Sequence, residues 1–262
     1  MSFVFSRPSF LAAVAVLALA GPALAQDKAP VIAAASDLQF AVAEIAAAFK
    51  TETGKDVELS MGSTGNFATQ IRNGAPFQIF MAADERFIAE LNAEGFTRDA
   101  GDLYAEGRVV IMAPHGSALK PDAALDNLEA MLNAGTLTKF AIANPDHAPY
   151  GKRAEEALRH RGLWDSIQPQ MVLGENVSQA AQFALSGNAD GGIIAYSLAL
   201  APEVAKLGEF ALIDHDWHEP LLQRMVLLKN AGPVAEAFYA YMQSPTARGI
   251  MEKYGFALPE GN

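Results

Sequence analysis

Four short segments of the chain carry residue types that could bind an anion without any basic side chain. They are Ser36–Asp37, Gly62–Asn66, Pro149–Gly151 and Asn176–Gln179, and each follows an apolar run and precedes a helical pattern. The first N–H groups of a helix have no intrahelical partner and lie at the positive end of the helix dipole. Hydroxyl, amide and glycine residues at such a position are typical of a helix cap and also of an anion site. The spacing along the chain does not by itself decide between the two.

The elements that would position these segments alternate between buried strands and helices. We expect strands at 29–36, 57–61, 77–83, 107–114, 139–144 and 169–175, one beginning at 191, and one at 221–229. Ser36 with Gln39, and Asn176 with Gln179, have capping-box spacing, which predicts caps at Ser36 and Asn176. Alternating strands and helices with short connections predict an α/β architecture with mostly parallel sheets. Ligands of such sheets bind at the carboxyl ends of the strands, where all four segments lie.

Composition excludes several classes of function. The 262 residues include 19 Lys and Arg against 30 Asp and Glu, a net charge of −11, which argues against nucleic-acid binding. The absence of cysteine excludes disulfides, thiolate metal sites and a cysteine-linked lipid anchor.

The first 25 residues have the pattern of a signal peptide. Arg7 precedes the apolar run 10–20, and the small residues of 23–25 form a cleavage pattern. We therefore expect 1–25 to be a signal peptide and the protein to be exported to the periplasm.

Longer stretches of the chain resemble a known family. Residues 31–85, 140–158 and 174–200, with the motifs AAAS, G-S-[ST]-G and NP…APYG in this order, are similar to the ModA family of periplasmic molybdate-binding proteins, the substrate-binding components of ABC importers. The resemblance implies a two-lobed type II periplasmic-binding-protein fold, with an oxyanion held between the lobes. It implies lobe 1 at 26–110 with 226–262 and lobe 2 at 111–225, with the lobes joined by hinge strands at 107–114 and 221–229. It also implies that the protein is a monomer whose partners are molybdate or tungstate and the membrane permease, with no nucleic acid.

The resemblance also implies ligand-binding residues, with no cofactor, no direct metal-cation ligand and no catalytic residue. The positions that match the family's motifs are Ser36, Thr64 with its neighbour Ser63, Tyr150, and the main-chain donor of Val177. A tyrosine that some members use falls on Ala195, so whether the neighbouring Tyr196 contacts ligand stays open. Whether Asp37 contacts ligand stays open too, although a first-turn carboxylate facing solvent is the simpler interpretation.

Other functions fit parts of the sequence. The same fold could bind phosphate, sulfate or a small carboxylate, the last with Arg72 or Arg153 as a bidentate partner. A ferric receptor would use Tyr150 and Tyr196. A metal-dependent hydrolase would use His215 and His218, or Ser63 as a nucleophile, although no histidine is an evident base for it.

Overall fold

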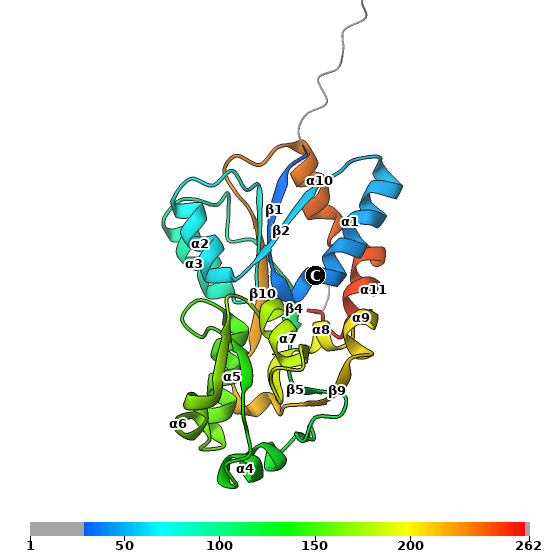
Figure 1. Ribbon diagram of the computed structural model, residues 1–262. Helices are drawn as coiled ribbons and strands as arrows, with labels where there is room; N and C mark the ends of the chain where they lie inside the picture. The colour runs from blue at the N-terminus through cyan, green and yellow to red at the C-terminus, as the bar shows by residue number, and fades with distance from the viewer. Residues whose placement is uncertain (1–28, 260–262) are drawn as a thin grey trace, which may run out of the picture.

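The computed structural model describes residues 29–259, which form two α/β lobes (Figure 1). Each lobe contains one five-stranded sheet flanked by helices. The expected signal peptide, 1–25, lies outside the described residues. Among the residues that are described, no helix is both long enough and apolar enough to cross a membrane.

The sheet of lobe 1 is built from both ends of the chain. Its strands, in spatial order, are β2 (Glu58–Gly62), β1 (Val31–Ala35), β3 (Ile79–Ala82), β10 (Leu221–Leu227) and β4 (Asp102–Gly107). β2, β1 and β3 are parallel, and β10 is antiparallel to both β3 and β4. Four strands therefore run in one direction and only β10 opposes them, which confirms the mostly parallel sheet that the sequence predicts.

Alternation along β1 sends side chains to opposite faces of this sheet. Ile32 and Ala34 pack with α1 (Gln39–Thr53), α10 (Pro233–Tyr241) and α11 (Pro245–Lys253). Ala33, between them, packs on the other face, which is covered by the two helices α2 (Thr64–Arg72) and α3 (Glu85–Ala93). Figure 1 shows the two helical layers on either side of β1 and β2.

Lobe 2 repeats this plan. Its strands, in spatial order, are β7 (Met171–Gly174), β6 (Phe140–Ala143), β8 (Gly191–Ala195), β5 (Val109–Pro114) and β9 (Gly208–Leu212). Here β5 is the strand that opposes the others. The helices of this lobe are α4 (Asp126–Asn133), α5 (Pro149–His160), α6 (Trp164–Ile167), α7 (Val177–Leu185), α8 (Tyr196–Ala199) and α9 (Pro202–Ala205). Three short 3₁₀ helices complete the described chain: η1 (Ser36–Leu38), η2 (Gln168–Gln170) and η3 (His215–Trp217).

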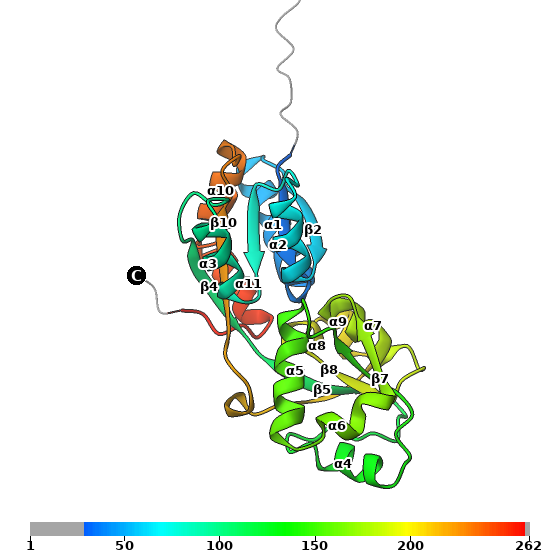
Figure 2. The same ribbon diagram turned by 90° about the vertical axis from the view of Figure 1, so that its left-hand side faces the viewer.

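Two connections join the lobes, as Figure 2 shows. The chain leaves lobe 1 at Arg108, between β4 and β5, and returns through 213–220, between β9 and β10. The lobe boundaries expected after residues 110 and 225 fall inside β5 and β10. Each of these strands pairs along its length within a single sheet, so each belongs to one lobe. The strands expected to act as hinges are thus sheet strands, and the crossings lie just outside them.

Candidate anion-binding site

All five residues that the sequence singles out surround one small cavity between the lobes. Ser36, Ser63 and Thr64 reach it from lobe 1, and Tyr150 and Val177 reach it from lobe 2. The parallel strands β1, β2 and β6 end here, as the topology predicts. The cavity has a volume of about 10 Å³, room for about one water molecule, so a tetrahedral oxyanion requires it to widen.

Two hydroxyl groups at this cavity are fixed by amide donors. Ser178 donates its main-chain N–H to Ser36 Oγ at 3.2 Å, and Ala83 donates its N–H to Thr64 Oγ1 at 3.0 Å. Each oxygen accepts one hydrogen bond, and neither hydroxyl donates to any acceptor in the described part of the chain. Both protons therefore stay available to an anion. The cap predicted at Ser36 is wrong, because α1 begins after η1 and no side chain caps it.

Three helices present their N-termini to the same cavity. Ser63 caps α2 by accepting from Asn66 N, and Asn176 caps α7 by accepting from Gln179 N, which confirms the second predicted cap. Pro149 stands at the first position of α5 and has no N–H group, so this position adds no donor without an acceptor. Within residues 29–259, the first-turn N–H groups of Thr64, Tyr150 and Val177 have no acceptor. They are oriented donors for a negative charge.

Asp37 is buried beside these donors, so the expectation of a solvent-facing carboxylate is wrong. Only 1% of the residue is exposed, and it lines the cavity. Its Oδ2 accepts from Gln223 Nε2 at 2.7 Å and from the Tyr150 hydroxyl at 3.1 Å. Burial raises the pKa of Asp37 to about 6, against the opposing effect of these two hydrogen bonds and of the nearby N–H groups of Asp37 and Leu38.

A buried chain of hydrogen bonds continues from Asp37 into lobe 1. Gln223 Nε2 also donates to the Tyr150 hydroxyl at 3.0 Å, and Tyr104 donates to Gln223 Oε1 at 2.8 Å. Burial and the Asp37 charge raise the pKa of Tyr150 well above its ordinary value, so the phenol keeps its proton. The Tyr150 hydroxyl donates its hydrogen bond to Asp37 Oδ2 in this structure. Gly107 makes room for the arrangement, because a Cβ there would collide with the Tyr150 hydroxyl and with Gln223.

The lobes are held together by direct hydrogen bonds around the cavity. Gly65 N donates to His147 O at 2.9 Å, Ser178 Oγ donates to Ser36 O at 2.8 Å, and Ser197 Oγ donates to Asp37 O at 2.8 Å. Together with the contacts of Ser36 and Asp37 described above, these bonds define a closed form. A ligand of the cavity can enter only when they break.

Comparisons with known proteins agree with this architecture. A model of the family described as bacterial extracellular solute-binding protein matches residues 30–257. The molybdate-binding protein ModA of Rhodobacter capsulatus is 34% identical over 244 residues, 92% of each chain. The Azotobacter vinelandii ModA is 33% identical over 261 residues, 98% of this chain and 100% of its own. The chain belongs to the ModA family of extracellular solute-binding proteins.

A solved structure of the same family confirms the fold. The periplasmic molybdate-binding protein of Azotobacter vinelandii superposes with a TM-score of 0.78 at 31% identity, covering 89% of this chain and all of its own. The two-lobed type II periplasmic-binding-protein fold expected from the resemblance is thereby confirmed.

One residue at the lobe interface of this ModA-family chain was not found from the sequence. His147 Nδ1 lies 2.9 Å from Ser63 Oγ, and its Nε2 lies 3.7 Å from Glu175 Oε2. His147 stands in the NP…APYG motif, but only the closing of lobe 2 on lobe 1 brings it to Ser63. A histidine therefore does neighbour Ser63, contrary to the expectation from the sequence.

The other residues considered from the sequence lie away from the cavity. Tyr196 packs edge-on against Phe210, with ring centroids 5.7 Å apart. Arg72 pairs with Glu90 and Glu94. Arg153 is buried, and its Nε lies 3.2 Å from Glu156 Oε2.

The two histidines proposed for a metal do not form a site together. His215 groups with the exposed carboxylates of Asp214 and Asp216, whereas His218 Nδ1 contacts Glu219 O. Among residues 29–259, no metal-sized cluster contains both histidines.

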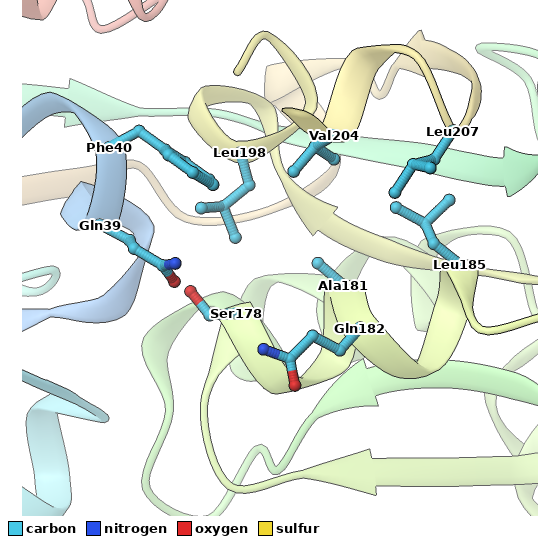
Figure 3. A pocket seen from close by; sticks show the side chains of 9 residues that line it. All are labelled: Gln39, Phe40, Ser178, Ala181, Gln182, Leu185, Leu198, Val204 and Leu207. Carbon is cyan, nitrogen blue, oxygen red and sulfur yellow. The ribbon is translucent and has the colours of Figure 1, made fainter. Parts of the chain in front are cut away.

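A second and larger cavity adjoins the lobe interface (Figure 3). Its volume is about 280 Å³, and its walls are mainly carbon, with Phe40 from α1 facing Leu185, Leu198, Val204 and Leu207 from lobe 2. Gln39, Ser178 and Gln182 are the polar residues that line it, and an anion buried against its carbon walls would have few donors, which is costly. The smaller, donor-lined cavity is the better candidate for an anion.

Proposed function

We propose that the protein is a periplasmic solute-binding protein that captures molybdate or tungstate between its lobes and delivers it to the membrane permease of an ABC importer. In this proposal it acts as a monomer, without cofactor and without catalysis. Support comes from the relatives named molybdate-binding protein and from the family of extracellular solute-binding proteins.

The observation that carries the proposal is the convergence of neutral donors. Ser36 and Thr64 each have a hydroxyl proton to give, and Thr64, Tyr150 and Val177 each have a free main-chain N–H. No basic side chain among the described residues lines this cavity. Hydrogen bonds to an anion are charge-assisted and about twice as strong as neutral ones, so neutral donors are sufficient.

Closure would couple binding to transport. Donors from both lobes reach the anion only in the closed form, so the ligand shifts the population toward that form. The permease would then recognise the closed pair of lobes.

The Ser63–His147 contact does not favour a hydrolase. Ser63 Oγ already accepts from Asn66 N as a helix cap, and the side chain of Glu175 is 70% exposed at 3.7 Å from the ring. We interpret the contact as part of the closure. An activated ester should show no turnover that depends on Ser63, and loss of turnover in Ser63→Ala would contradict this.

Asp37 supports a second candidate ligand. An ionised carboxylate in the cavity could accept a hydrogen bond from a protonated oxyanion such as phosphate, which molybdate at neutral pH cannot offer.

Isothermal titration with molybdate, tungstate, sulfate and phosphate separates the candidates. The proposal expects tight one-to-one binding of molybdate and tungstate, with sulfate and phosphate much weaker. Tight phosphate binding without molybdate binding would establish the second candidate instead.

A further inference from the structure

Asp37 has one carboxylate oxygen that the protein leaves without a partner. Oδ2 receives both side-chain donors, from Gln223 and Tyr150, whereas Oδ1 makes no hydrogen bond with the described chain, although the main-chain N–H groups of Asp37 and Leu38 lie near the carboxylate. The residue is 1% exposed and lines the donor cavity, so water cannot replace the missing partner freely. A buried acceptor oxygen without a hydrogen-bond donor is unfavourable. It indicates that a group from outside the chain supplies the missing hydrogen-bond partner.

The surroundings of Asp37 offer it no compensating charge. The groups that face it are Tyr150 from α5, Gln223 from β10 and, beyond Gln223, Tyr104 from β4. Ser197 from α8 bonds only to its main-chain oxygen. All are neutral at ordinary pH. An ionised Asp37 and a dianion in the same cavity would therefore repel each other, with no cation among the residues that line it to screen them.

We propose that Asp37 contacts the bound oxyanion as a neutral carboxylic acid, with a proton on Oδ1 that is donated to a ligand oxygen. The inference rests on the proposed function, because it concerns the same cavity. The proton comes from solvent and stays on the carboxyl group, and no covalent bond changes. Binding of each dianion is therefore accompanied by protonation of Asp37. The carboxylic acid then donates a hydrogen bond to the ligand, as the other groups of the site do.

The pH dependence of affinity follows directly. Burial has raised the pKa of Asp37 to about 6 in the ligand-free closed form, and a bound anion raises it further. Binding requires the protonated form, so the apparent Kd equals the intrinsic Kd divided by the protonated fraction. That fraction falls from about one half at pH 6 to about 0.01 at pH 8, so the affinity should fall about 50-fold.

Titration calorimetry with molybdate at pH 6 and pH 8, in two buffers of different ionisation enthalpy, tests this. The wild-type protein should bind molybdate about 50-fold more weakly at pH 8 than at pH 6. At pH 8 it should also take up about one proton for each molybdate bound. Asp37→Asn keeps an acceptor for Gln223 and Tyr150 and offers an N–H₂ to the ligand. Its affinity should be the same at both pH values and at least about tenfold tighter than wild type at about pH 8.

The outcomes are distinguishable. Molybdate binding without proton uptake and without pH dependence in the wild type would overturn the role of Asp37 and leave the proposed function standing. No molybdate binding at either pH would overturn the proposed function itself. The His147→Gln variant should retain the pH dependence of molybdate affinity. If this variant loses the pH dependence, the proton belongs to His147 and the proposal is overturned. The proton count uses wild-type protein, so the test holds even if Asp37→Asn fails to fold.

Discussion

Gly65 is the point where the closed form can be disturbed without touching a ligand donor. It lies in the first turn of α2, and its N–H donates to His147 O across the lobe interface at 2.9 Å. A Cβ built on Gly65 would lie 2.7 Å from His147 O and 3.0 Å from His147 Cα, whereas ordinary contacts begin at 3.4 Å. Gly65→Ala should therefore move the lobes apart by about 0.7 Å at this contact, the difference between 3.4 and 2.7 Å.

The expected magnitude follows from the two hydrogen bonds of His147. The contacts Gly65 N–His147 O and Ser63 Oγ–His147 Nδ1, both 2.9 Å, would lengthen to about 3.6 Å, beyond hydrogen-bonding distance. Each contributes about 1 kcal/mol net, so the closed form loses about 2 kcal/mol. The Kd for molybdate should rise about 30-fold.

Closure should separate from folding in this variant. The substitution leaves the cores within both lobes intact, so Gly65→Ala should keep the circular dichroism spectrum of wild type and lose at most about 2 kcal/mol of unfolding free energy. Gly249→Ala in α11 is the matched control, because no atom lies within 4 Å of its built Cβ. It should leave the Kd unchanged. An unchanged Kd in Gly65→Ala, measured by calorimetry beside this control, would show that binding does not require this contact.

Variants at three positions test the donors and the buried carboxyl. Thr64→Val removes the hydroxyl proton and should weaken molybdate binding by about 10- to 150-fold in calorimetry. The control Thr64→Ser keeps the hydroxyl, and its affinity should stay within a few-fold of wild type. Equal affinities of the two variants would contradict the role of the hydroxyl. Val177→Pro removes a main-chain N–H at the first position of α7, where proline is tolerated, and should cost about tenfold or more in affinity with an unchanged circular dichroism spectrum. Asp37→Asn should also change stability, since a carboxyl pKa raised from 3.8 to about 6 destabilises the fold above pH 6 and the penalty disappears as the pH falls below both values. The unfolding free energy of the variant minus that of wild type should thus grow by about 2–3 kcal/mol between pH 4 and pH 7 in denaturant titrations, and a constant difference would refute the buried titration.

Within each lobe, topology made the gathering of the candidate residues predictable, whereas the meeting of the two lobes was implied by the resemblance to the ModA family. Ser36, Thr64 and Val177 each follow a strand of a mostly parallel sheet, and the carboxyl ends of such strands meet at one edge. Two lobes facing each other then bring the edges together. That these residues hold a ligand stays a prediction until the variants are measured.

The environment of Asp37 was not predictable, because it arises from contacts that are distant in the sequence. Its partners Tyr150 and Gln223 lie 113 and 186 residues away. A carboxylate in a first helical turn ordinarily faces solvent, whereas Tyr150 from α5 and Gln223 from β10 contact this one and it is buried. The contact between His147 and Ser63 was not predicted for the same reason, since the two residues are 84 positions apart.

All six central strands were predicted from the sequence, whereas two of the four edge strands were missed. β1, β3, β6 and β8 lie inside their sheets and have short apolar runs. β4 (Asp102–Gly107) and β9 (Gly208–Leu212) are edge strands with acidic residues, and neither was predicted. Edge strands need less apolar surface because one side is unpaired, which weakens their signal.

Anomalous diffraction would show whether a tetrahedral oxyanion lies between the hydroxyls of Ser36 and Thr64. Crystals of the protein grown with tungstate would locate the heavy atom without assumptions about its ligands. We expect one anomalous peak between the lobes, with oxygens about 2.7–3.2 Å from Ser36 Oγ, Thr64 Oγ1 and Val177 N. A peak elsewhere, or none at saturating tungstate, would contradict it.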